Sequence, residues 1–279
     1  MKVSFTKMQG AANDYIYVDC FKETIDDPSS LAVAMSPRHF SVGADGLVLI
    51  MPSSVADARM RMFNADGSEG LMAGNALRCM AKYLYDNEYS KGDLVKIETA
   101  GGVKNVRVYT VNGKVTSASV DMGRASVDVS GLRLAIPESV VVDHPARIGG
   151  QDYRITCVDV GNPHCVVFCE RVDSVDVSHV GPQFEYAPLF PDRINTEFIR
   201  VVNPRTIQMR VWERGSGETM ACGTGACASV AAAIANGLCE KGTDVTVRAR
   251  GGDLIVNCTD ERVTLTGDAS LVYTGEIEY

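Results

Sequence analysis

The sequence has little that would place it in a membrane or on a nucleic acid. No apolar run approaches the ~20 residues that span a bilayer. Residues 1–10 lack the apolar core of a secretory signal. The net charge is −8 and the pI about 5.1, without the basic stripe that nucleic acids require. We therefore expect a cytoplasmic protein with neither a membrane nor a nucleic-acid partner.

The cysteines and histidines lack the spacing of a metal site or of a disulfide framework. Nine cysteines, an odd number without regular spacing, are typical of a reducing compartment. No paired CxxC set is present and the four histidines are scattered, so we expect no metal.

The glycine-rich segment at residues 223–228, GTGACA, resembles a dinucleotide-binding fingerprint only superficially. Polar residues precede it where a buried strand is needed, and the following strand ends in basic residues at 248–250 rather than in an acidic one. No Gly-Lys-Ser/Thr follows, which excludes a Walker loop. These absences argue against a nucleotide cofactor.

An internal repeat organises what is present. Residues 60–85 align within residues 209–236 at a constant offset of 149 (209 − 60), which pairs Phe63 with Trp212 and Gly74 with Gly223. One register recurring over most of the chain predicts two related halves. We expect the first half to span 1–121, joined by a returning strand at 269–279, and the second half to span 122–268.

Each half is predicted to contain one helix that follows a polar turn. The helices begin near residue 74 and at Gly223, and the second is apolar on every side, which predicts a buried core helix with strands wrapped around it. The first N–H groups of a helix have no intrahelical partner and carry partial positive charge. Such an end can bind a carboxylate.

Cys222 immediately precedes the second of these helices. A cysteine in an alanine-rich segment is often only a small core residue. At a helix start, however, we expect its pKa to be lowered in favour of the thiolate. If both helix starts grip one carboxylate, residues 73 and 222 flank the adjacent carbon, as stereoinversion by one base and one acid requires. The offset pairs Cys222 with Ala73, which cannot carry a proton.

The motifs of this chain resemble those of the diaminopimelate epimerase family, cofactor-independent two-cysteine enzymes of lysine and peptidoglycan-precursor synthesis. The resemblance covers nearly the whole chain, and the segments that carry it are KMQGAANDY, RHFSVGADG, NADGSEGLMAGNALRC, GNPHCV, INTEF and WERGSGETMACGTGACA. It implies an α+β fold of two pseudo-symmetric domains, each a mixed β-sheet rolled as a barrel around a central helix. It also implies a homodimer that interconverts LL- and meso-2,6-diaminopimelate by a thiol/thiolate two-base mechanism without cofactor or metal.

The same resemblance assigns roles to individual positions. Cys222 matches one catalytic cysteine, Ala73 stands at the position of the other, and His164 and Glu213 match residues that assist them. The positions that match substrate contacts are Asn13, Asn64, Gly74, Asn75, Asn162, Asn195, Glu213, Arg214, Gly223 and Thr224.

Ala73 is the departure with the largest consequence. It predicts an inactive or impaired Cys-to-Ala variant, with epimerisation lower by roughly 10² to 10⁴-fold and one-sided proton exchange through Cys222. Two alternatives stay open. One is a related racemase or isomerase of the same fold, independent of pyridoxal phosphate, that acts on another amino acid. The other is a non-catalytic amino-acid-binding protein that keeps the pocket.

Overall fold

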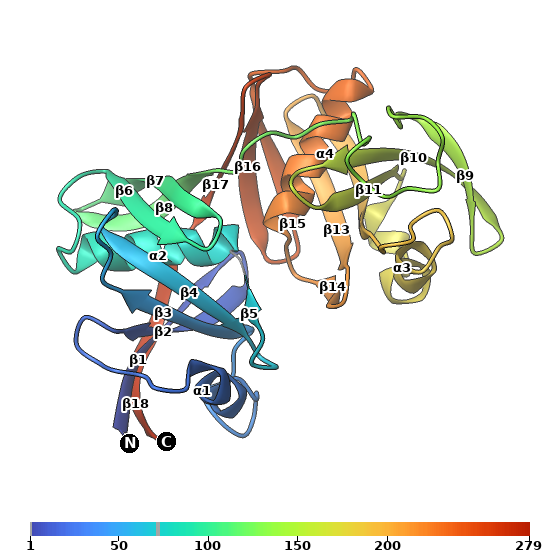
Figure 1. The fold of residues 1–279 in the computed structure, drawn as a ribbon. Helices are drawn as coiled ribbons and strands as arrows, with labels where there is room; N and C mark the ends of the chain where they lie inside the picture. Colours follow the sequence, from blue (N-terminus) through green and yellow to red (C-terminus); the bar gives the residue numbers. More distant parts are fainter. Residues whose placement is uncertain (1, 71–72) are drawn as a thin grey trace. The chain divides into compact units, whose positions relative to one another are not determined.

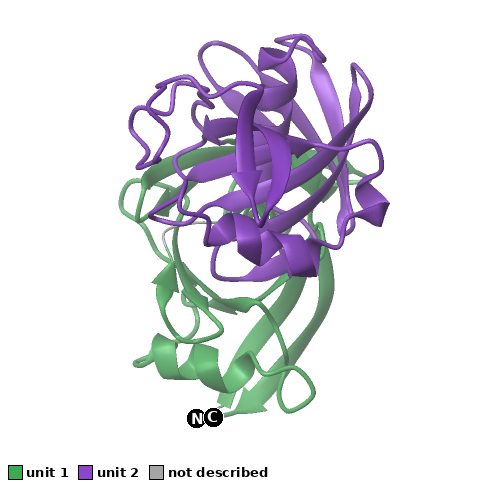
Figure 2. Cartoon of the chain, turned by 90° about the vertical axis from the view of Figure 1, so that its right-hand side faces the viewer, with its two compact units in different colours: residues 1–121, 266–279 green, residues 122–265 purple. Residues whose placement is uncertain are grey.

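The chain forms two compact units, coloured separately in Figure 2. The computed structural model describes residues 2–70 and 73–279. Unit 1 comprises Met1–Asp121 and Thr266–Tyr279, and unit 2 comprises Met122–Leu265. That these units are the functional halves expected from the repeat stays a prediction.

Unit 1 is a mixed sheet around the helix α2 (Figure 1). Its strands pair in the order β18-β1-β2-β3-β4-β6-β7-β8, with β2–β3 and β4–β6 parallel and the other pairs antiparallel. Helix α2 packs against β1, β2, β6, β7 and β8, so strands from both halves of this order meet the same helix. The bounds are β1 Lys2–Gly10, β2 Asn13–Asp19, α1 Pro28–Met35, β3 Gly46–Met51, β4 Ala58–Asn64, β5 Glu69–Gly70, α2 Gly74–Asp86, β6 Leu94–Thr99, β7 Gly102–Val111, β8 Lys114–Asp121 and β18 Ser270–Glu278.

Unit 2 repeats this plan around the helix α4. Strands β11–β12 and β13–β15 are parallel, the neighbouring pairs are antiparallel, and α4 packs against β10, β11, β12, β13, β15 and β16. The bounds are β9 His144–Ile148, β10 Gln151–Asp159, β11 Pro163–Phe168, the 3₁₀ turn η1 Val172–Ser174, α3 Val177–Glu185, β12 Asn195–Asn203, β13 Thr206–Glu213, β14 Gly217–Thr219, α4 Gly223–Ala235, β15 Asp244–Ala249, β16 Gly252–Cys258 and β17 Val263–Asp268, the last of which contains the unit boundary.

The side chains of the strands in unit 1 alternate between a face that packs against α1 and a face that packs against α2. Ile16 and Leu47 are fully buried on the face that packs with Leu31 of α1. On the opposite face of the same strand, the hydroxyl of Tyr17 donates to the carbonyl of Ala76 in α2 at 3.1 Å. Because successive residues of a strand point to opposite faces, β2 packs against α1 with one face and against α2 with the other.

The internal repeat is visible in the strand registers. Tyr15 pairs with Gly46 across β2 and β3, and the residues 149 positions later, His164 and Asn195, pair across β11 and β12. Helices α2 and α4 begin and end at positions related by the same offset. The predicted α+β fold, pseudo-symmetric with one central helix in each unit, is confirmed.

Helix α3 has no clear signal in the sequence. Helix α3 contains Pro182, which removes one backbone hydrogen-bond donor from the helix. A proline inside the segment also argues against a helix when only the sequence is read. The side chain of Asp176 caps its start by accepting from the N–H of His179. Its core residue Phe184 packs edge-on against Phe198 of β12, with ring centroids 5.5 Å apart. Helix α3 therefore covers the face of β12 that is turned away from α4.

Candidate active site

Cys222 occupies the N-cap of α4. Its backbone is extended, with φ −125° and ψ 120°, so the sulfur accepts the N–H of Gly225 at 3.4 Å. The hydroxyl of Thr224 lies 3.4 Å from the same sulfur. A side chain in this position satisfies one of the free donors at a helix start. The thiol is therefore fixed at the positive end of the helix dipole.

The expectation that the helix start favours the thiolate is wrong for this structure. Burial raises the pKa of the Cys222 thiol well above its ordinary value, and the negative charges of Glu213 and Glu197 raise it further. The hydrogen bonds from Thr224 and Gly225 lower it by less. Desolvation outweighs the dipole because a thiolate at this depth loses its hydration.

Glu213 lies close enough to that thiol for its negative charge to raise the pKa of Cys222. It ends β13 and accepts a hydrogen bond from the hydroxyl of Thr219. Burial raises the pKa of the Glu213 carboxyl above its ordinary value. A neighbouring carboxyl and thiol, both of raised pKa, are groups that can pass one proton between them. This pair has the composition of a general acid–base unit.

His164 joins the same cluster from β11. Its side chain is fully buried, with Nδ1 2.7 Å from Oε1 of Glu197 and Nε2 3.0 Å from Oδ1 of Asn162. The amide Nδ2 of Asn162 donates to Oγ1 of Thr224 at 3.4 Å. A continuous chain of polar contacts therefore leads from Glu197 to the first turn of α4.

Asn195 and Arg214 form a second contact in unit 2. Oδ1 of Asn195 accepts the backbone N–H of Arg214 at 2.9 Å, while Nδ2 of Asn195 donates to the carbonyl of Pro163 at 2.9 Å. The guanidinium of Arg214 donates to the carbonyl of Asp192 at 3.1 Å and is part of an exposed loop. The asparagine thus fixes the turn from which the arginine projects.

The predicted residues of unit 1 gather at the start of α2. Ala73 is the N-cap, with φ −130° and ψ 128°, and no side chain caps the helix. Nδ2 of Asn75 donates to Oδ1 of Asn13 at 3.3 Å, and Nδ2 of Asn13 donates to Asp45 at 2.6 Å. Gly74 is the first helical residue. The predicted residues Asn13, Ala73, Gly74 and Asn75 thus lie at one helix start.

Asn64 is the exception in unit 1. It ends β4 and is exposed, and its amide donates to Oγ of Ser68 within the following turn at 2.9 Å. Residues 71 and 72, which belong to the motif that leads into α2, lie outside the described residues.

Sequence reasoning missed two carboxylates that support the predicted residues. Glu197 holds the imidazole of His164, and Asp45 holds the amide of Asn13. Glu197 lies two residues after Asn195 on a strand, so alternation places both on one face. A charged residue within an otherwise buried strand was the signal that could have indicated it.

Comparison with known proteins matches these features to one family. The sequence profile of diaminopimelate epimerase matches residues 5–127 and 156–276. The diaminopimelate epimerase of Pelotomaculum thermopropionicum is 49% identical over 278 residues, covering 99% of each chain. That of Acetivibrio thermocellus is 46% identical over 276 residues, covering 98% of each chain.

The chain belongs to the diaminopimelate epimerase family. The resemblance seen in the motifs is thereby confirmed, as is the class of enzyme, an isomerase. Solved structures at lower identity share the fold. A PhzF-family phenazine biosynthesis protein of Bacillus anthracis superposes with a TM-score of 0.72 at 16% identity, covering 100% of both chains. A probable proline racemase of Agrobacterium radiobacter gives 0.71 at 12% identity, covering 99% of this chain and 93% of that one.

The described residues contain neither a metal-binding cluster nor a membrane-spanning helix. Within residues 2–70 and 73–279, no group of three or more histidine, cysteine, aspartate or glutamate side chains is arranged to hold a metal ion. In the same residues, no helix is both long and apolar enough to cross a membrane.

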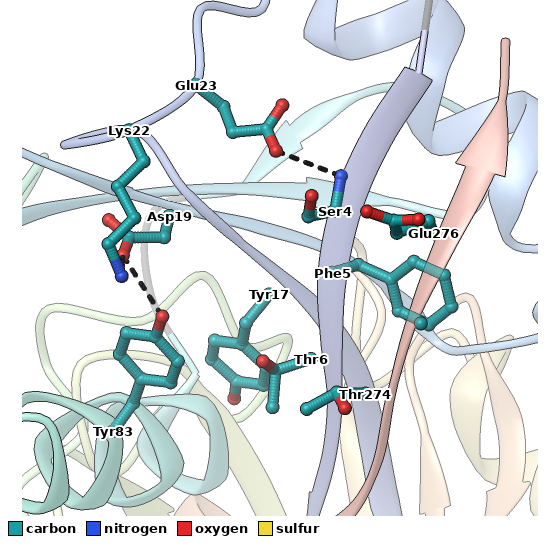
Figure 3. A pocket seen from close by; sticks show the side chains of 11 residues that line it. Ser4, Phe5, Thr6, Tyr17, Asp19, Lys22, Glu23, Tyr83, Thr274 and Glu276 are labelled. Carbon is teal, nitrogen blue, oxygen red and sulfur yellow. Dashed lines mark hydrogen bonds and ion pairs between the residues drawn. The ribbon is translucent and has the colours of Figure 1, made fainter.

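A pocket of about 350 Å³ lies within unit 1, away from the start of α2 (Figure 3). Tyr83, from the C-terminal half of α2, faces it together with Asp19 and Lys22. The hydroxyls of Tyr83 and Tyr89 both donate to Asp19, at 3.1 and 2.7 Å, and Lys22 pairs with the same carboxylate at 3.0 Å. None of the predicted site residues lines this pocket, so it is distinct from the epimerase cluster.

Proposed function

We propose that this protein is a diaminopimelate epimerase whose reaction, the interconversion of LL- and meso-2,6-diaminopimelate, is impaired by Ala73. The observation that carries the proposal is the position of Cys222 at the N-cap of α4, where the charge of Glu213 acts on its thiol. We further propose that it works as a cytoplasmic homodimer in the supply of lysine and peptidoglycan precursors, as the resemblance implies.

The chemistry begins with proton removal from the substrate carbon next to the carboxylate. In this step Glu213 takes the proton of Cys222, and the resulting thiolate takes the hydrogen of the substrate carbon as a proton. The electron pair of the broken C–H bond stays on that carbon and spreads into the carboxylate. The first N–H groups of α4, at Gly223 and Thr224, suit that carboxylate because they are aligned with the helix dipole.

The distal end of the substrate requires a different set of groups. Diaminopimelate carries a second amino-acid group with both charges, which suits amides and a guanidinium. Asn195 and Arg214 provide these in unit 2, and Asn13, Asn64 and Asn75 provide further amides in unit 1. We propose that these groups select a diamino diacid over a simple amino acid.

Inversion also requires an acid on the opposite face of the carbon, and the proposal assigns this role to position 73. The methyl group of Ala73 cannot donate a proton, so the carbanion regains its proton on the Cys222 side. The chain as it stands should therefore exchange the hydrogen of one isomer with solvent without completing inversion. That residue 73 and Cys222 flank one carbon stays a prediction.

Ala73→Cys tests the proposal. We expect interconversion of LL- and meso-diaminopimelate to rise by roughly 10² to 10⁴-fold, the usual worth of a positioned acid–base group. The assay follows isomer ratios by chiral chromatography, without added pyridoxal phosphate or metal. Ala73→Ser is the matched control, since its hydroxyl is of similar size but is a far weaker acid.

The outcome separates the alternatives. Activity of Ala73→Cys on another amino acid but not on diaminopimelate would indicate a racemase of different specificity. Binding of diaminopimelate, measured by calorimetry, without conversion of either isomer would indicate a non-catalytic binding protein. Either result would contradict the proposed function.

A further inference from the structure

Glu197 is a buried carboxylate that the reaction described above does not use. It lies on β12 two residues after Asn195, and its side chain is fully buried. Oε1 contacts His164, and Oε2 has no hydrogen-bond partner among the described residues. A buried carboxylate without compensation is costly, so its placement here demands a reason.

The contact with His164 supplies that compensation. The 2.7 Å separation of Oε1 of Glu197 and Nδ1 of His164 requires a hydrogen between the two atoms. The hydrogen bond made by one ring nitrogen of a histidine fixes the ring orientation and the role of the other nitrogen. Nε2 is thereby directed at Asn162, 3.0 Å away.

The first turn of α4 is built around the same carboxylate. A Cβ atom added at Gly225 would lie 2.7 Å from Oε1 of Glu197 and 3.2 Å from Cβ of Cys222. A glycine at this point lets the helix start approach Glu197 that closely. The carboxylate is therefore in contact with both the imidazole and the turn that carries the thiol.

We propose that Glu197 is a positioning residue of the epimerase site. It accepts the Nδ1–H of His164 and fixes the ring plane, so that Nε2–H donates to Oδ1 of Asn162. Asn162 in turn orients Thr224, whose hydroxyl lies 3.4 Å from the sulfur of Cys222. Glu197 touches neither substrate nor reacting atoms, and its effect on turnover rests on the proposed function.

Nitrogen NMR of histidine-labelled protein tests the contact without any assay of activity. We expect a protonated Nδ1 at His164, with its N–H proton far downfield because the acceptor is charged. Glu197→Gln should shift this proton upfield, since an amide oxygen carries no full charge. Glu185→Gln is the matched control. Glu185 is also buried in unit 2 and accepts from Nε1 of Trp212 at 2.7 Å, so its replacement should leave the His164 signal in place.

Kinetics in the Ala73→Cys protein test the role in turnover. We expect Glu197→Gln to lower kcat by about tenfold to a hundredfold, the usual effect of losing an orienting partner, with KM changed much less. Glu197→Asp keeps the charge and should recover part of the loss. It also serves as the second variant if Glu197→Gln does not fold.

An unprotonated Nδ1 at His164, a signal unmoved by Glu197→Gln, or an unchanged kcat would each overturn the proposal. If Ala73→Cys has no activity on diaminopimelate, the proposed function fails. The NMR experiment still decides whether Glu197 fixes His164.

Discussion

The two units share a backbone plan but differ in what faces their central helices. At positions related by the repeat offset of 149, unit 2 carries a polar cluster where unit 1 is largely apolar. The counterparts in unit 1 are Tyr15 for His164, Val48 for Glu197 and Ala73 for Cys222. The comparison shows that the barrel and its helix are a scaffold, and that the chemistry depends on a few inward-facing side chains.

The comparison also distinguishes carboxylate binding by a helix start from proton transfer. Both helices start with free N–H groups, so both can attract a carboxylate. Of these two helices, only α4 has a proton-carrying group at its N-cap, close to a carboxyl of raised pKa. We therefore expect changes in unit 2 to affect chemistry most, and equivalent changes in unit 1 to affect mainly stability until a thiol is restored at position 73.

The largest effect should follow from Cys222→Ala, which makes the start of α4 chemically equivalent to the start of α2. We expect exchange of the substrate's α-hydrogen with D₂O to fall by 10³-fold or more, because the remaining base is lost. Mass spectrometry of each isomer after incubation measures this. Cys227→Ala, on the next turn of α4 and fully buried, is the control and should keep exchange. Exchange that persists in Cys222→Ala would mean that another group removes the proton.

The second prediction concerns the helix position that contacts Glu197. Gly225 in α4 corresponds to Ala76 in α2, where Val48 replaces the carboxylate. Gly225→Ala should destabilise unit 2 by about 2 kcal/mol, because overpacking against a buried group exceeds the gain of about 1 kcal/mol in helix propensity. Trp212, the only tryptophan, lies in unit 2, so its fluorescence in a denaturant titration follows that unit.

The reverse change, Ala76→Gly, is the control for Gly225→Ala. It should destabilise unit 1 by about 1 kcal/mol through helix propensity alone. A Gly225→Ala protein that is more stable than the parent would show that Glu197 has room to move, and the contact between the two would lose its significance.

The sequence was informative where the determinants are local. Apolar residues at helical spacing predicted a helix start near 74, a run of small apolar residues predicted one at 223, and both helices begin there. The repeat offset predicted two similar units because it is a property of the chain alone. The family motifs then indicated most of the residues that cluster at the start of α4.

What the sequence could not show depends on tertiary contacts. Glu197 and His164 are 33 residues apart and meet only through the parallel pairing of β11 and β12, which no local pattern reveals. The pKa of Cys222 was predicted with the wrong sign because the helix dipole is visible in the sequence whereas the depth of burial is not. The contact of Asn64 with Ser68 in the turn after β4 was likewise not indicated by the sequence.

The smallest effect should come from capping α2 in the way that α4 is capped. In α4 the sulfur of Cys222 accepts the N–H of Gly225, whereas Ala73 offers no acceptor to Ala76, although its extended backbone is that of an N-cap. Ala73→Ser should stabilise the start of α2 by about 1 kcal/mol, the usual worth of a serine cap. Amide hydrogen exchange of the first turn should then slow by roughly fivefold.

Ala73→Val is the control for this cap, because it adds bulk without an oxygen and should give no protection. Equal protection in the serine and valine proteins would mean that packing, rather than a hydrogen bond, limits the helix start. The serine protein should still fail to invert diaminopimelate, since a hydroxyl is far less acidic than a thiol. Stability at the start of α2 and chemistry at position 73 would thereby be separated at a single residue, as they cannot be at Cys222, where one sulfur performs both tasks.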